Sequence, residues 1–426
     1  MNQHVKKTFL NNKVNFFNDQ KNFLESKLSE GTKTYNESEH SQKKSLARFL
    51  FRLIQIVLSK QMHNTFNIIT RSYNAKKLRR QIKRIHSIET EISDQHNFGQ
   101  TAAYIFCEDG KILVYKPRCA SNEKLVDDII TGLLNSDAGK RLVIYSEKKY
   151  SFLRYIDTKK EKLDATFYYN LGLILPFLNR IGLSDLHNEN ILFENNVPKF
   201  IDAECIFQNF SPAILFLKKE NIFSKTSYLR HSLTDTGIFP IFSNKDSNLK
   251  YLLNYGLDFK IKNKSDQKNK LWHECEKQLF DGLKDANKLW EVKIKDIELY
   301  VEKAIKSIEI RVCMLSTYIY VQIIKLITDP CHAINQDLYN KLFTILFDSR
   351  DGYKVKGIPI IDIAQSEMQA LLVYDVPAYK FKLSKKDAKN FLNRFKSVNR
   401  ITKNNHIKLL ILELNLILKT FNKILK

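Results

Sequence analysis

The spacing of hydrophobic residues divides this chain into three zones. Up to about residue 90, apolar side chains recur three or four positions apart, as at Leu46, Phe49 and Leu53, which is the period of an amphipathic helix. From Ser93 onward, short apolar runs bounded by turn residues are typical of strands. Helical spacing returns beyond Ser211 and dominates the rest of the chain. The pattern therefore predicts an α+β protein with helices at both ends.

The middle zone contains the strands and the two helices that separate them. We expect strands over residues 101–106, 111–116, 142–145 and 150–155, and helices over 123–134 and 164–181. In the last zone, residues 272–320 form a long amphipathic stretch, on whose end Arg311 and Thr317 would lie about two turns apart. The two side chains could then face one site together, although the spacing does not require it.

A hairpin is predicted after the helix that ends near residue 181. Ile191-Leu-Phe193 and Lys199-Phe-Ile201 are its strands, and residues 194–198 form the turn. Asp185 and Asn190 precede the hairpin and Asp202 follows it directly. The hairpin should therefore bring these three polar groups near one another.

Phosphoryl transfer uses that combination of groups. A carboxylate receives or orients the attacking hydroxyl, while an amide and a second carboxylate hold Mg²⁺ on the nucleotide phosphates. Asn190 follows Asp185 by five residues, then come a hairpin and Asp202, which is the order of a protein-kinase catalytic loop and metal-binding Asp. The alternative interpretation is a polar turn beside an ordinary hairpin.

Lys116 lies near the end of a predicted strand, in Val114-Tyr-Lys-Pro-Arg118. With the polar loop that contains Gly99, it resembles a kinase phosphate roof and its strand lysine, although the glycine-rich sequence is absent. A lone lysine on a strand more often faces solvent. The helix that follows carries three carboxylates that could brace Lys116, and the sequence does not distinguish them: Glu123, Asp127 and Asp128.

Composition narrows the class of protein. Hydrophobic residues make up 43% and aromatic residues 12% of 426 residues, which is typical of globular chains. Six cysteines without a C-x-x-C pair, and no evident signal peptide, favour a cytoplasmic protein with reduced thiols. The formal net charge of +23 would attract anionic partners. The densest basic cluster, residues 76–84, lacks interleaved aromatic residues, so we do not expect a nucleic-acid site. The most apolar run near the N-terminus, Phe49 to Leu58, is interrupted by Arg52 and is far shorter than the ~20 residues that a membrane span needs, so we expect no membrane partner.

Seven segments in a fixed order resemble the dehydratase domain of class II lanthipeptide synthetases, over roughly residues 90 to 380. The segments are Ser93-Asp-Gln-His-Asn-Phe-Gly99, Val114-Tyr-Lys-Pro-Arg118, Ser184-Asp-Leu-His-Asn-Glu-Asn190, Pro198-Lys-Phe-Ile-Asp-Ala-Glu204, Thr236-Gly-Ile-Phe-Pro240, Arg311 with Thr317, and Glu367-Met-Gln-Ala-Leu-Leu-Val-Tyr-Asp-Val-Pro377. The resemblance implies an ATP- and Mg²⁺-dependent enzyme that phosphorylates Ser or Thr of a ribosomal precursor peptide. It would then eliminate the phosphate to give dehydroalanine or dehydrobutyrine.

The resemblance also assigns roles around the nucleotide. Lys116 would grip its phosphates, and Asn190 and Asp202 would hold Mg²⁺, with Glu204 nearby. Asp185 would orient or deprotonate the substrate hydroxyl.

Further matched positions concern the transferred phosphate. His187 would lie beside it during transfer. Asp94, His96, Arg311 and Thr317 match positions linked in the family to the active site and to phosphate elimination. Arginine suits the second role because its planar fork matches phosphate geometry.

The resemblance implies a kinase-like two-lobed core with an N-terminal helical cap and a mostly helical C-terminal part. We expect residues 1–90 to form the cap and 91–165 the N-lobe, with the phosphate roof and the Lys116 strand. Residues 166–426 would form the C-lobe, with the catalytic loop, the metal-binding hairpin and a helical extension. No cyclase domain is expected, so a separate cyclase could be a partner.

One departure keeps two other functions open. The family usually has a second arginine four residues after the first, where this chain has Leu315. That difference favours a peptide or protein kinase that stops at the phosphate ester. A protein of another class, an inactive kinase-like peptide-binding protein, is the further alternative. The combined presence of Lys116, Asp185, Asn190 and Asp202 favours an enzyme over that scaffold.

Overall fold

The structure is a computed structural model of residues 1–426. It describes residues 25–31, 33, 40–74, 85–90, 92–134, 141–158, 164–186, 189–207, 233, 236–239, 268–312, 317–330, 354–355, 358–382, 385–401, 407–408 and 410–415.

The chain divides into two compact units that each combine distant segments. The first comprises Met1–Ala120, Val143–Tyr155 and Cys313–Tyr379. The second comprises Ser121–Leu142, Ile156–Val312 and Lys380–Lys426. The boundaries of these units differ from those of the helical cap, N-lobe and C-lobe expected from the sequence. That three-part division stays a prediction.

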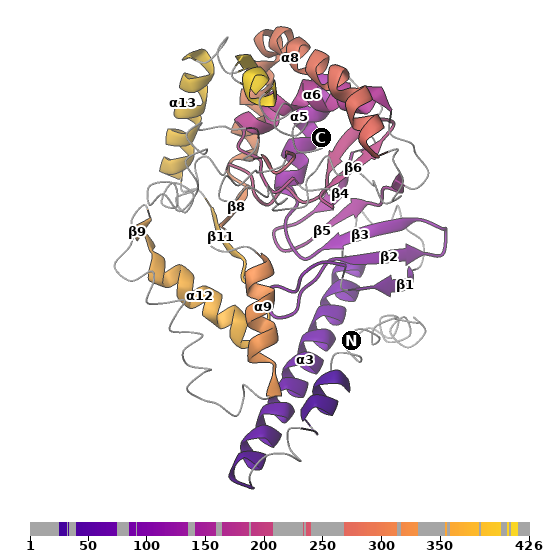
Figure 1. Ribbon diagram of the computed structural model, residues 1–426, viewed down its shortest axis with the longest axis vertical. Helices are drawn as coiled ribbons and strands as arrows, with labels where there is room; N and C mark the ends of the chain where they lie inside the picture. The colour runs from indigo at the N-terminus through magenta and orange to yellow at the C-terminus, as the bar shows by residue number, and fades with distance from the viewer. Residues whose placement is uncertain are drawn as a thin grey trace. The chain divides into compact units, whose positions relative to one another are not determined.

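The first unit contains an antiparallel five-stranded sheet, visible in Figure 1, with the order β1-β2-β3-β5-β4. Its strands are β1 (Ile85–Glu89), β2 (Ala103–Cys107), β3 (Ile112–Lys116), β4 (Val143–Ser146) and β5 (Ser151–Arg154). Alternate residues of β2 and β3 are buried, as period-two side chains require on a sheet with one covered face. The sheet and the flanking helices confirm the α+β class that the sequence predicts.

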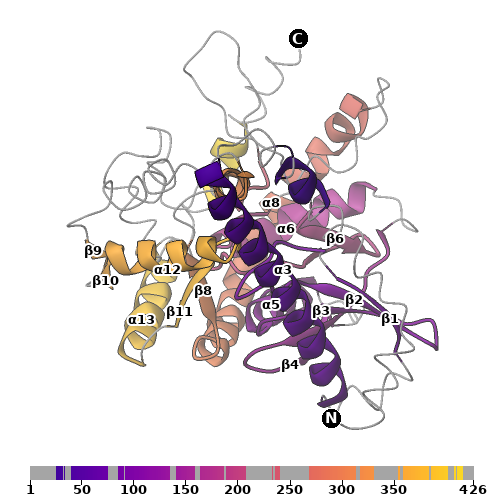
Figure 2. The same cartoon turned by 90° about the horizontal axis from the view of Figure 1, so that it is seen from below.

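The helix α3 (His40–Asn74) supplies part of the cover for this sheet (Figure 2). Ile68 and Ile69, near its C-terminal end, belong to the same hydrophobic core as Ile105 and Phe152 of the strands. Arg71 on the same helix donates a 2.6 Å hydrogen bond to the Tyr115 hydroxyl. Apolar burial and one polar contact therefore fix the C-terminal end of α3 against the sheet.

Strand β1 corrects the prediction that residues 1–90 are all helical. Ile85 and Ile88 are both buried and lie three positions apart, which imitates helical spacing. The register of β1 against β2 shifts between Ile85 and Ser87, so an irregularity in the strand produces that spacing. Residues 85–89 are therefore a strand within the range that was predicted to be helical.

The first unit also holds the segment that follows the second unit's long helix. Its elements are α9 (Thr317–Ile327), β9 (Lys354–Val355), β10 (Ile358–Pro359) and α12 (Ile360–Leu372). Helices α9 and α12 share a small core, and the Tyr320 hydroxyl donates a hydrogen bond to the Glu367 carboxylate between them.

The second unit is built on helices packed around a short hairpin. Its elements are α5 (Ser121–Leu134), α6 (Ala165–Arg180), β6 (Ile191–Glu194), β7 (Val197–Phe200), α8 (Lys268–Ala304), β8 (Glu309–Val312), β11 (Tyr379–Lys382) and α13 (Lys385–Ile401). The first residue of β11, Tyr379, is the last residue of the first unit. Asp164 caps α6 by accepting a 2.7 Å hydrogen bond from the Thr166 amide. The strands β6 and β7 lie within a residue or two of their predicted positions.

Two glycines let α6 and α8 approach closely. A Cβ on Gly172 would lie 2.1 Å from the Leu279 carbonyl oxygen, and a Cβ on Gly282 would lie 2.1 Å from the Tyr169 carbonyl oxygen. Each helix therefore contacts the other's backbone where only hydrogen can fit. This contact fixes α6, and the loop that follows α6 carries Asp185.

The long helix predicted over residues 272–320 was wrong in its C-terminal part. Helix α8 ends at Ala304, and Arg311 lies on strand β8. Ile308 and Ile310 are both buried, each 1% exposed, and Arg311 lies on the opposite face of the strand. Because Arg311 is on a strand and Thr317 begins α9, the expected two-turn separation on one helix does not exist.

Among the described residues, none of the helices combines the length and apolar character that crossing a bilayer requires. Four cysteines lie in the described part of the chain and are not in disulfides: Cys107, Cys119, Cys205 and Cys275. Burial, and to a smaller extent the nearby Asp109 carboxylate, raise the pKa of the Cys107 thiol to about 11.

Candidate active site

The hairpin formed by β6 and β7 closes on the residues predicted to handle the nucleotide. The Ile201 amide donates to the Asn190 carbonyl oxygen at 3.0 Å, directly beyond the last paired residues of the two strands. The Asn190 side-chain amide donates to the Asp185 carbonyl oxygen at 2.9 Å. Asp202 follows Ile201 on the chain. The structure therefore gathers Asp185, Asn190 and Asp202 at the base of one hairpin.

Backbone contacts hold the Asp185 loop in an uncommon conformation. Asp185 has a φ of 65°, in the left-handed region, which Asp tolerates better than most residues. The next amide, that of Leu186, donates to the Thr236 carbonyl oxygen at 2.9 Å. Gly237, with a φ of 80°, packs so closely that a Cβ there would lie 2.9 Å from the Leu186 nitrogen. The Thr236–Gly237 segment thus packs against the Asp185 loop and holds its backbone in place.

Oxygen atoms at the hairpin base match the ligand preference of a hard cation. Carboxylate oxygens of Asp202 and the amide oxygen of Asn190 are the donors that Mg²⁺ prefers, with nucleotide phosphates completing its shell. Within the described part of the chain, no group of three or more His, Cys, Asp or Glu side chains is arranged to hold a metal by itself. Asn190 and Asp202 therefore offer the hard oxygen donors that fit Mg²⁺.

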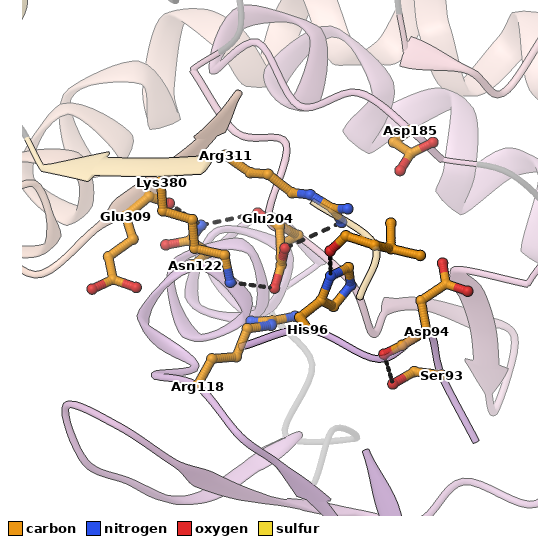
Figure 3. A network of polar contacts seen from close by, with 12 residues as sticks. Ser93, Asp94, His96, Arg118, Asn122, Asp185, Glu204, Glu309, Arg311 and Lys380 are labelled. Carbon is orange, nitrogen blue, oxygen red and sulfur yellow. Dashed lines mark hydrogen bonds and ion pairs between the residues drawn. The ribbon is translucent and has the colours of Figure 1, made fainter. Parts of the chain in front are cut away.

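Glu204 is the centre of a small charged cluster, shown in Figure 3. One of its carboxylate oxygens lies 3.3 Å from Arg311 Nη1, and the other lies 2.9 Å from Lys380 Nζ. The Arg311 amide also donates to the Glu204 carbonyl oxygen at 3.3 Å. The predicted residues Glu204 and Arg311 are therefore in direct contact, and Lys380 joins them.

The two-stranded ribbon of β8 and β11 explains this arrangement. Side chains two apart on a strand share a face, so Glu309 and Arg311 lie together on β8, as Lys380 and Lys382 do on β11. Lys382 Nζ lies 3.2 Å from a Glu309 carboxylate oxygen. Asn122, at the start of α5, donates to the backbone carbonyls of Ala203 and Glu309 and so ties the ribbon to the Glu204 segment.

The carboxylates of α5 have their own environments. Lys199 and Asp127 form a buried ion pair at 2.8 Å, with side chains 1% and 6% exposed. Asp128 pairs on the surface with Lys124 and Arg141, each at 2.8 Å. The third carboxylate of the helix, Glu123, is fully buried. The bracing of Lys116 by a carboxylate of this helix stays a prediction.

In the first unit, the loop over residues 93–99 is fastened to Asp375. The Asp375 carboxylate accepts hydrogen bonds from the amides of Phe98 and Gly99 and forms an ion pair with Lys60 of α3. Both side chains of that pair are almost completely buried. Two motifs separated by more than 270 residues, the early polar loop and the late Asp-Val-Pro element, are therefore one structural feature.

Asp94 and His96 lie on this loop. His96 Nδ1 is 2.6 Å from the Val376 carbonyl oxygen, and the Val376 amide donates to the Gln95 carbonyl oxygen at 2.9 Å. Asp94 is exposed, and its carbonyl oxygen accepts from the Ser93 hydroxyl. The contact with Val376 orients the His96 ring.

Lys116 lies at the end of β3, where it is paired with Ser151 of β5, and it is only 8% exposed. A lysine that merely faced solvent would be far more exposed. The burial is therefore consistent with a functional or structural partner for its ammonium group. His187, Leu315 and the side chain of Thr317 lie outside the described residues.

Three residues that make the contacts above were not predicted from the sequence: Lys60 in the first unit, and Asn122 and Lys380 in the second. Lys380 and Lys382 flank Phe381, and Glu309 and Arg311 flank Ile310, so both short segments alternate charged and apolar residues. That period-two alternation was the available signal for a charged ribbon.

Two comparisons place the chain among known proteins. A curated protein of Lactococcus lactis subsp. lactis, "Lacticin 481/lactococcin biosynthesis protein LcnDR2", is 26% identical over 162 residues. The match covers 35% of this chain and 17% of that protein, so the chain spans less than a fifth of the relative's length. The model of a family described as "Domain of unknown function (DUF4135)" matches residues 48–278, which is more than half of the chain and includes Lys116, Asp185, Asn190 and Asp202. The protein therefore belongs to the DUF4135 family.

Proposed function

We propose that this protein is a lanthipeptide dehydratase-like enzyme. It would use ATP and Mg²⁺ to phosphorylate Ser or Thr of a ribosomal precursor peptide and then eliminate the phosphate to leave dehydroalanine or dehydrobutyrine. A kinase-like two-lobed core would carry both steps. The observation that carries the proposal is the base of the β6–β7 hairpin, where hydrogen bonds gather Asp185, Asn190 and Asp202.

The residues at this base fit the cofactors that the reaction needs. Asn190 and Asp202 would hold Mg²⁺, and Lys116 would contact the nucleotide phosphates. Bound ATP supplies the phosphoryl group, and the metal neutralises the charge that develops during transfer. The fit rests on the hard oxygen donors of the pair and on the burial of Lys116.

In the first step, Asp185 would orient the peptide hydroxyl and take its proton as the oxygen bonds to phosphorus. The bond from that phosphorus to its former oxygen breaks, so ADP leaves. His187 is proposed to lie beside the transferred phosphate. The support of the Asp185 loop by Thr236 and Gly237 would keep the carboxylate in place for this role.

In the second step, a base removes the Cα proton of the phosphorylated residue. The electrons of the C–H bond form the Cα=Cβ double bond, and phosphate leaves from Cβ. Arg311 would stabilise the leaving phosphate, and Glu204 would hold Arg311 through their 3.3 Å contact. Asp94, His96 and Thr317 are further residues that we assign to this step through the family resemblance.

The relative from Lactococcus lactis supports the substrate class. Its printed name places it in lacticin 481/lactococcin biosynthesis, and its likeness to this chain motivates the choice of a precursor peptide as substrate. A separate cyclase that closes rings on the dehydrated residues is a proposed partner. A cytoplasmic location would suit an enzyme that draws on ATP.

Mass analysis of a peptide co-expressed with the protein tests the proposal. Dehydration lowers the peptide mass by about 18 Da per site, whereas phosphorylation raises it by about 80 Da. We expect the lower mass. If only the higher mass appears, the protein is a peptide kinase, the alternative that Leu315 favours. If neither appears with any candidate peptide and ATP is not consumed, the inactive peptide-binding alternative replaces both.

A further inference from the structure

The charged cluster at Glu204 points to a second phosphate-binding cation. We propose that Lys380 and Arg311 together form a site for a phosphate dianion. The proposal rests on the proposed function and deepens it, because the dianion would be the phosphate that leaves the modified peptide.

The first reason is the geometry around a single carboxylate. Glu204 places one oxygen 2.9 Å from Lys380 Nζ and the other 3.3 Å from Arg311 Nη1. Lys380 and Arg311 are partly buried, with 21% and 11% of their side chains exposed, and Glu204 between them is buried. One acidic group therefore contacts two cationic heads, one at each of its oxygens (Figure 3).

The second reason is charge. Two cations and one carboxylate leave the trio with a net charge of +1, so an anion gains from binding there. An ammonium has three N–H donors and a guanidinium has five, and both suit the oxygens of a phosphate. Charge-assisted hydrogen bonds from such groups are the strong interactions with phosphate oxygens.

The third reason is position. Glu204 follows Asp202 by two residues, so the cation pair is carried by the segment that also carries a proposed metal ligand. Lys380 lies on β11 of the β8–β11 ribbon, next to this segment. The same ribbon carries an ion pair between Lys382 and Glu309. Lys382 is 52% exposed and has no place in the proposed chemistry. It therefore offers a matched control on the same strand.

Inorganic phosphate is the probe for a direct test. The purified full chain and the variants Lys380→Gln, Lys380→Arg and Lys382→Gln are titrated with phosphate, without nucleotide, and followed by ³¹P NMR. We expect Lys380→Gln to weaken binding by at least about tenfold, equivalent to about 1.4 kcal/mol. Lys380→Arg and Lys382→Gln should stay within about threefold of wild type, since both keep the two cations at Glu204. Thermal melting checks that each variant is folded.

Co-expression with a substrate peptide gives the second readout. Lys380→Gln should accumulate the phosphorylated peptide, while Lys380→Arg and Lys382→Gln should give the dehydrated one. Phosphate binding by Lys380→Gln equal to that of wild type, or an equal loss in Lys382→Gln, would overturn the proposal. If wild type binds phosphate through Lys380 but modifies no peptide, the proposed function fails while the phosphate site stands.

Discussion

Asn190 donates its side-chain amide to the backbone carbonyl of Asp185 at 2.9 Å. This hydrogen bond uses the nitrogen of the side-chain amide, so the amide oxygen is the atom that would contact a cation at the hairpin base. Because Asn190 also accepts from the Ile201 amide, it connects the two ends of the hairpin with the loop before it. A single residue thereby sets the relation between the proposed catalytic base and the segment that carries Asp202.

Asp202→Asn should abolish ATP turnover and leave the protein folded. The substitution keeps the shape of the side chain but removes the negative charge that attracts Mg²⁺. ADP release measured with a substrate peptide tests this, and circular dichroism checks the fold. Asp281→Asn, at an exposed position on α8, is the control and should keep wild-type turnover. Equal turnover in Asp202→Asn and wild type would rule out the metal-binding role.

Lys116→Met should lower peptide phosphorylation by orders of magnitude, because it removes a point charge proposed to contact the nucleotide phosphates. Lys111→Met is the matched control: it lies just before the same strand but is 58% exposed and pairs with Asp109. Rates from initial phosphate incorporation would separate the two. If both variants phosphorylate at the wild-type rate, Lys116 has only a structural role.

Gly237→Ala should reduce phosphorylation by displacing the Asp185 loop. The new methyl group would lie 2.9 Å from the Leu186 nitrogen, at a residue with a φ of 80°. Gly110→Ala is the control, since its φ is 78° but nothing lies within 4 Å of its Cβ. Both variants carry the cost of a left-handed alanine, about 1 kcal/mol, whereas only Gly237→Ala meets the loop. Similar phosphorylation rates in the two variants would contradict the supporting role of Gly237.

The sequence could predict the hairpin because all of its determinants are local. Turn residues at Asn195 and Asn196, both with positive φ, separate two short apolar runs, and polar groups stand at both ends. The prediction that Asp185, Asn190 and Asp202 lie near one another followed from that hairpin alone. Local patterns of this kind are visible in a single chain.

The charged cluster could not be predicted in the same way. The partners of Glu204 lie 107 and 176 residues further along the chain, on two strands that are only four residues long. Arg311 was expected on a helix, because helical spacing in α8 was extended past its true end at Ala304. Tertiary pairing of short strands leaves too little periodicity to detect in one sequence.

Arg311→Ala should still consume ATP but accumulate phosphorylated peptide instead of dehydrated peptide. Phosphorylation uses the hairpin base, whereas Arg311 is proposed to stabilise the departing phosphate. By analogy with the loss of one hydrogen-bond donor to a transition state, the activation free energy of elimination should rise by about 3 kcal/mol. Arg141→Ala is the control, because Arg141 is 63% exposed and pairs with Asp128 on the surface. Dehydrated peptide at the wild-type level in Arg311→Ala would make Arg311 a structural residue.

Lys199→Met should destabilise the second unit strongly, by about 3 to 5 kcal/mol, because it leaves the Asp127 carboxylate buried without its 2.8 Å partner. Lys124→Met removes the lysine of the Lys124–Asp128 surface ion pair on α5, the helix that carries Asp127. It should lower the free energy of unfolding by less than about 1 kcal/mol. Chemical denaturation of the two variants measures the difference. The double variant Lys199→Met, Asp127→Asn should recover part of the loss, since it removes the buried charge and keeps a side-chain oxygen that can accept from the Leu142 amide. If Lys199→Met alone unfolds at the wild-type denaturant concentration, the ion pair contributes nothing, and α5 is held by its apolar face alone.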